Sequence, residues 1–198
     1  KFWSYRFDNV IGVDKSEEYA NMTRQRCADR PHVQVYHNDS AAFLRSFVLA
    51  YRAARRTDIP FFYLDAHFYD PQERWVIKRE LQALQGFPQC LIAIHDFQVP
   101  HEPDLGHLTY DGEPLSFAVV REELAAINPD FSYYTNSREW SAVHTAESIV
   151  GVTGLLPDED TLETIAYHHT DWRKYRGILY CTPTPLDLRH YQLKELPL

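Results

Sequence analysis

Four side chains that can bind a metal ion or carry a proton follow two apolar runs of the sequence: Asp65, His67, His95 and Asp96. The first run is FFYL at residues 61–64, and the second is LIAI at residues 91–94. Imidazole and carboxylate groups together suit Mn, Fe or Zn, whereas Mg prefers carboxylates alone. A bound metal lowers the pKa of a hydroxyl, and a nearby base can then remove its proton. These residues therefore predict a site that deprotonates a substrate hydroxyl.

The stretch from residue 61 to residue 97 predicts how these side chains are positioned, because it has the pattern strand, helix, strand. Both apolar runs lack polar alternation, which is typical of strands covered on both faces in a parallel sheet. Between them, Asp70 is a suitable helix N-cap, Pro71 suits the first helical position and Gly86 ends the helix. Ligands bind beyond the carboxyl ends of parallel strands. We therefore expect all four side chains at one edge of the sheet.

The roles of these side chains can be ranked from the geometry of a strand. Neighbouring residues of a strand point to opposite faces, so His95 and Asp96 both bind a metal only if the strand has already ended. We therefore rank Asp65 and Asp96 as metal ligands ahead of His95. Asp65 is also a candidate general base, and His67 is a candidate base or substrate-orienting residue. In the alternative interpretation, the aspartates cap the following segments and the histidines are hydrogen-bonded structural residues.

The rest of the chain alternates between apolar runs and amphipathic segments. We expect strands at residues 9–13, 33–37, 131–135 and 177–181, and helices at residues 16–28, 41–56 and 116–127. This alternation favours an α/β fold with a doubly wound, mostly parallel sheet. We expect residues 1–198 to form one domain, with residues 98–115 as a loop or lid and residues 138–176 as an insertion. Ser16 and Ser40 are the expected N-caps of two helices, and the Pro-rich tail is expected to be peripheral.

Composition and charge narrow the range of partners. The 198 residues are 44% hydrophobic, enough for one sizeable core. The net charge of -8 argues against a nucleic-acid partner, and no apolar run approaches the ~20 residues that cross a membrane. Cys27, Cys90 and Cys181 lack the spacing of a metal site, which favours buried thiols in a reducing cytoplasm. We expect a cytoplasmic protein with a small-molecule substrate, and a homo-oligomer stays open.

The order of the acidic strand ends resembles the class I, Rossmann-like S-adenosylmethionine-dependent methyltransferases. The motif VIGVD places Asp14 where that family holds the ribose hydroxyls, and HNDS offers Asp39 and Ser40 for the adenine. The fourth strand of that family ends in the motif that faces the methyl group, which here is LDAH. The fifth ends in IHDF, which is similar to the HD or DD endings of metal-assisted O-methyltransferases that act on sugars and small natural products. The resemblance covers residues 10–135. It implies S-adenosylmethionine as the cofactor and a divalent metal, Mg or Mn, as an assistant.

The glycine-rich loop that follows the first strand in that family is missing here, because the sequence contains no GxG. We take residues 2–7 as the tail of the first helix, so we expect the first strand and its loop to precede Lys1. The leading hypothesis is methyl transfer to an oxygen of a small acceptor. Two alternatives stay open: a metal-dependent oxygenase or hydrolase that uses His67, His95 and Asp96, and a non-catalytic methyltransferase-like binding domain.

Overall fold

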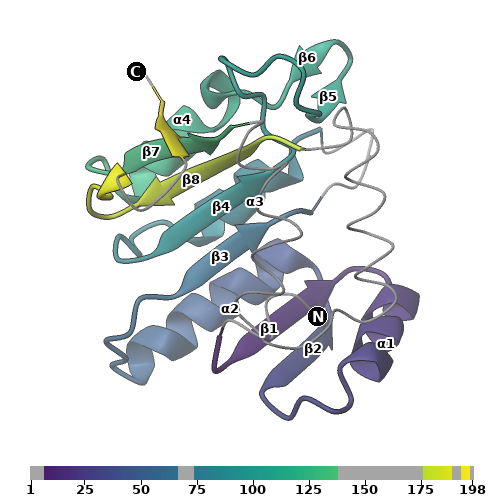
Figure 1. The fold of residues 1–198 in the computed structure, drawn as a ribbon. Helices are drawn as coiled ribbons and strands as arrows, with labels where there is room; N and C mark the ends of the chain where they lie inside the picture. Colours follow the sequence, from purple (N-terminus) through teal and green to yellow (C-terminus); the bar gives the residue numbers. More distant parts are fainter. Residues whose placement is uncertain (1–6, 67–73, 138–175, 189–192, 197–198) are drawn as a thin grey trace.

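The computed structural model describes residues 7–66, 74–137, 176–188 and 193–196, and its elements are drawn in Figure 1. The strands are β1 (Val10–Asp14), β2 (Val33–His37), β3 (Phe61–Leu64), β4 (Leu91–His95), β5 (Thr109–Tyr110), β6 (Glu113–Pro114), β7 (Ser132–Asn136), β8 (Ile178–Thr182) and β9 (Leu193–Glu195). The helices are α1 (Glu17–Arg26), α2 (Ser40–Ala53), α3 (Val76–Ala83) and α4 (Phe117–Ile127). The expectations for residues 2–7, 67–73 and 138–175 lie outside the described residues.

The expected doubly wound, mostly parallel sheet is wrong. The largest sheet has the strand order β3-β4-β8-β7-β9, and in it only the β3–β4 pairing is parallel, while the other three pairings are antiparallel. Strands β1 and β2 form a separate parallel pair, and β5 and β6 form a short antiparallel hairpin. The physical reason is that an unbroken apolar run, such as that of β8, indicates a strand whose two faces are both covered. It does not indicate whether the strand runs parallel or antiparallel to its neighbours.

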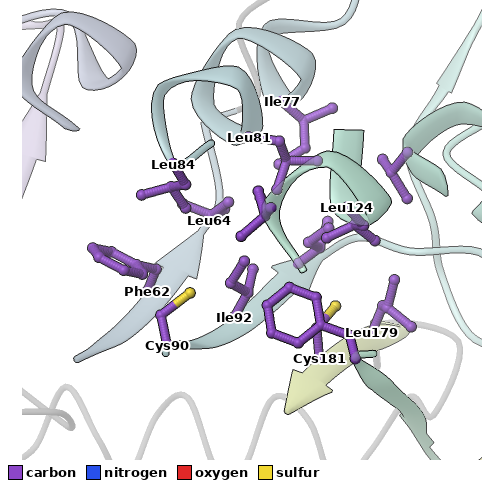
Figure 2. Close-up of a cluster of buried hydrophobic side chains, with 14 of the residues drawn as sticks. Phe62, Leu64, Ile77, Leu81, Leu84, Cys90, Ile92, Leu124, Leu179 and Cys181 are labelled. Carbon is purple, nitrogen blue, oxygen red and sulfur yellow. The ribbon is translucent and has the colours of Figure 1, made fainter. Parts of the chain in front are cut away.

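One face of the large sheet is covered by α3 and α4, which pack against each other. Figure 2 shows leucines of these helices pointing toward the side chains of β3, β4 and β8. The labelled members of this core are Phe62, Leu64, Ile77, Leu81, Leu84, Cys90, Ile92, Leu124, Leu179 and Cys181. Burial of each large side chain contributes roughly 1.5–3 kcal/mol, so this face holds β3 and β4 rigidly in place.

Helix α2 joins the two sheets, because its aromatic side chains reach a strand of each. The ring of Phe43 lies 5.0 Å from that of Tyr36 in β2, and the ring of Phe47 lies 5.8 Å from that of Phe62 in β3. The helix begins one residue earlier than expected, since Asp39 rather than Ser40 is its N-cap, and it ends at Ala53. The expected cap of α1 is confirmed, because the Ser16 side chain accepts a hydrogen bond from the Tyr19 N–H.

The segment 98–115 contains the β5–β6 hairpin and three apolar side chains that are 2% exposed or less: Val99, Leu105 and Leu115. The guanidinium of Arg74 donates to the Tyr110 carbonyl oxygen at 2.7 Å, and the ring of Trp75 lies 4.8 Å from the ring of Tyr110. The hairpin is thereby tied to the start of α3. The tail is not peripheral, because β9 pairs with β7 and Leu196 is only 4% exposed.

Candidate metal centre

Asp65, His95 and Asp96 come together beyond the carboxyl ends of β3 and β4. The two strands are parallel neighbours in the register Leu64↔Ile94, and in Figure 1 both arrows end at the same edge of the sheet. His95 Nδ1 lies 2.9 Å from Asp65 Oδ1 and 3.4 Å from Asp96 Oδ1. One ligand atom from each of the three side chains lies within 4.8 Å of the others, which is close enough to hold one metal ion.

The backbone of Asp96 explains how two neighbouring residues reach the same point. Strand β4 ends at His95, and Asp96 has a φ of 57°, in the left-handed region that few residues other than glycine adopt. The turn is held by two hydrogen bonds, from Leu108 N–H to the Asp96 carbonyl oxygen at 2.8 Å and from Phe97 N–H to the Gly177 carbonyl oxygen at 2.9 Å. Left-handed backbone costs about 1 kcal/mol or more, and such strain is concentrated at functional sites.

The three side chains differ in exposure, and a half-buried tyrosine lies next to His95. The side chain of Asp65 is 48% exposed, that of His95 is 22% exposed and that of Asp96 is 10% exposed. The ring of Tyr63 lies 5.7 Å from the ring of His95. Burial, followed by the charge of Asp65, raises the pKa of Tyr63, and burial raises the pKa of Tyr180 to about 12. Both phenols therefore stay neutral, and the negative charge of the site belongs to the carboxylates.

Arg176 is a member of the site that the sequence did not indicate. Its Nε atom lies 3.1 Å from Asp96 Oδ1, and its side chain is 45% exposed. Arg176 is 80 residues away from Asp96 in the chain, and a single arginine carries no motif, so only the pairing of β8 with β4 reveals the contact. Its backbone is positioned by Asn136 at the end of β7, whose side-chain amide donates to the Arg176 carbonyl oxygen at 2.9 Å.

The residues expected to hold the cofactor lie at the ends of the other parallel pair and also serve the local structure. Asp14 ends β1, and its Oδ1 accepts a hydrogen bond from Ser16 N–H at 2.8 Å. Asp39 caps α2 by accepting from Ala42 N–H at 2.9 Å, and its Oδ1 lies 3.2 Å from Arg79 Nη2. Ser40 is the first residue of α2. None of these residues belongs to the cluster around His95, and His67 lies outside the described residues.

The donor set fits a divalent metal with borderline hardness. Two carboxylates and one imidazole suit Mn²⁺, and they suit Mg²⁺ less well because it prefers oxygen ligands alone. The exposed side of Asp65 leaves access for a substrate oxygen. The guanidinium of Arg176 would share the Asp96 carboxylate with such an ion, and two cations on one carboxylate repel each other.

Comparison of the chain with family models, with curated proteins and with solved structures found no match. Within the described part of the chain, no helix combines the length and the apolar character needed to cross a membrane.

Proposed function

We propose that this protein is an S-adenosylmethionine-dependent O-methyltransferase that uses a divalent metal to activate a hydroxyl of a small acceptor. The observation that carries the proposal is the convergence of Asp65, His95 and Asp96 at the ends of β3 and β4, in a geometry suited to one metal ion. The order of acidic strand ends along the chain, with Asp14 as the last residue of β1 and Asp39 after β2, supports the choice of cofactor.

Each side chain has a role that follows from its exposure. A metal held by Asp65, His95 and Asp96 would supply positive charge that lowers the pKa of the acceptor hydroxyl. Asp65 is the most exposed of the three, so it can both contact the acceptor and accept its proton. The acceptor oxygen then forms a bond to the methyl carbon while the carbon–sulfur bond breaks, which gives a methyl ether and S-adenosylhomocysteine. Asp14, oriented by the Ser16 N–H, would accept hydrogen bonds from the ribose hydroxyls.

Metal binding is the first test. Manganese binding measured by electron paramagnetic resonance should show one site in the wild-type protein. The substitution Asp96→Asn should weaken manganese binding at least ~10-fold. Asparagine tolerates the left-handed backbone, so the variant should still fold. The control is Glu122→Gln, which removes the same charge from an exposed position of α4. Equal manganese affinity in the wild-type protein and Asp96→Asn would refute the site.

Cofactor binding is the second test, and it separates the proposed function from its alternatives. Calorimetric titration with S-adenosylhomocysteine should show binding that Asp14→Ala weakens strongly. Manganese binding without any heat from millimolar S-adenosylhomocysteine would instead favour a metal-dependent hydrolase or oxygenase. The absence of both manganese binding and S-adenosylhomocysteine binding would favour a binding domain without catalysis.

We also propose a cytoplasmic location, because Cys27, Cys90 and Cys181 are free and buried.

A further inference from the structure

Arg176 lies at the rim of the candidate metal centre, with its guanidinium against the most buried carboxylate. Its Nε atom is 3.1 Å from Asp96 Oδ1, and its side chain is 45% exposed whereas that of Asp96 is 10% exposed. The guanidinium therefore touches both the site and the solvent from which a substrate arrives. Guanidinium groups present several N–H donors in a fixed plane that matches carboxylates and phosphates.

The backbone around Arg176 is fixed from three sides. Asn136, which is 1% exposed, donates to the Arg176 carbonyl oxygen at 2.9 Å and accepts from the Ile178 N–H at 2.7 Å. Gly177 donates to the Gly106 carbonyl oxygen and accepts from the Phe97 N–H, both at 2.9 Å. Because these bonds involve no part of the arginine side chain, they hold the Arg176 backbone beside the site whether or not the guanidinium contacts Asp96.

A charge count shows what a metal would change. Without a metal, Asp65 and Asp96 carry two negative charges and Arg176 carries one positive charge, which leaves -1 on these side chains. A divalent ion bound with a neutral His95 changes this sum to +1. The whole chain has a net charge of -8, so the protein as a whole repels anions. A local excess of positive charge at the site would therefore attract an anion to that site specifically.

We propose that Arg176 recognises an oxyanion of the acceptor, a carboxylate or a phosphate beside the hydroxyl that reacts. The inference rests on the proposed metal site. In the metal-free protein, Arg176 neutralises part of the charge of Asp96. When the metal takes Asp96, the repulsion between the two cations turns the guanidinium toward the acceptor. The acceptor class is thus a small hydroxylated acid or a phosphorylated alcohol.

The test measures how an anion and manganese affect each other's binding. Manganese affinity is determined by electron paramagnetic resonance with glycolate, which has a carboxylate beside a hydroxyl, and with ethylene glycol, which is neutral. By linkage, if manganese tightens the binding of an anion by some factor, the anion tightens the binding of manganese by that same factor. We expect glycolate to do so about 10-fold more strongly in the wild-type protein than in Arg176→Gln, because a hydrogen bond between charged groups is lost. Ethylene glycol should have no effect on either protein.

Two control variants separate recognition from a structural role. Arg176→Lys keeps the charge and should retain part of the glycolate effect, and Arg45→Gln removes a charge from an exposed position of α2 and should retain all of it. Without glycolate, Arg176→Gln should bind manganese at least as tightly as the wild-type protein, because one repelling charge is gone. Weaker manganese binding with an unchanged glycolate effect would show that Arg176 only positions Asp96, and would overturn the proposal. If neither the wild-type protein nor any variant binds manganese, the proposed metal site is wrong, and the inference about Arg176 is then wrong as well.

Discussion

Replacing Gly177 by alanine should destabilise the protein and disturb the candidate site together. A Cβ atom at this position would overlap the Phe97 carbonyl oxygen and lie 2.8 Å from Val99 Cγ2. Cβ atoms in proteins essentially never lie closer than 3.0 Å to such a neighbour. The obstacle is backbone, which cannot turn away as a flexible side chain would. Gly177 must therefore move, and with it the hydrogen bonds to Gly106 and Phe97 on either side.

The size of the effect follows from three contributions. Overpacking costs about 1–3 kcal/mol. Two strained hydrogen bonds cost roughly 0.5–1.5 kcal/mol each when lost. Alanine restricts the unfolded chain, which offsets about 0.4–1 kcal/mol. The net loss lies between about 1 and about 5.5 kcal/mol and is centred near about 3 kcal/mol, which corresponds to a fall in melting temperature of roughly 6–12 °C for a chain of this size.

Urea unfolding of Gly177→Ala measures this loss, and Gly12→Ala is the matched control. Gly12 lies in β1, whereas Gly177 directly precedes β8, and a Cβ atom at Gly12 would be 3.7 Å from the nearest atom, a side-chain carbon of Val35, so we expect a change of less than about 1 kcal/mol. Gly177→Ala should also lose the effect of glycolate on manganese binding, since Arg176 moves with its neighbour. If the two alanine variants unfold at the same urea concentration, the close approach of Gly177 to Phe97 is wrong.

Three further predictions test other parts of the structure. Asn136→Ala should cost about 2–4 kcal/mol in urea unfolding, because it removes the partners of the Arg176 carbonyl oxygen and the Ile178 N–H; an unchanged midpoint would contradict these bonds. Leu81→Ala, at a fully buried position of α3, should cost about 2–5 kcal/mol, whereas Leu49→Ala, 68% exposed on α2, should cost less than about 0.5 kcal/mol. Burial raises the pKa of Cys90 and of Tyr180 to about 12, so their contribution to stability is complete below the pKa of the unfolded groups and is lost as the pH rises toward 12. Under reducing conditions, the free energy of unfolding should fall by roughly 1 kcal/mol per pH unit for each group, above about pH 9 for Cys90 and above about pH 10 for Tyr180, and a flat profile up to pH 11 would contradict their burial.

Local patterns in the sequence were enough to predict the elements that carry the site. The strand, helix and strand between residues 61 and 95 were expected from their apolar runs and from Gly86, but the expected start of the helix is wrong, because α3 begins at Val76 with Trp75 rather than Asp70 as its N-cap. The meeting of Asp65 and Asp96 follows from one rule about parallel neighbours, which needs only β3 and β4. The left-handed backbone of Asp96 was not predictable, because it is imposed by hydrogen bonds to Leu108 and Gly177 from distant parts of the chain.

The wrong direction of β8 and the missed role of Arg176 are the same error. Parallel strands bring their carboxyl ends to one edge of a sheet, whereas an antiparallel neighbour brings its amino end to that edge. Strand β8 pairs with β4 in the register His95↔Ile178, so the residues that precede β8 lie beside the residues that follow β4. Had β8 been parallel, Arg176 would lie at the opposite edge, far from Asp96. The mixed sheet is therefore what places the guanidinium of Arg176 against the Asp96 carboxylate, and the proposed site for a metal and an anion depends on this arrangement.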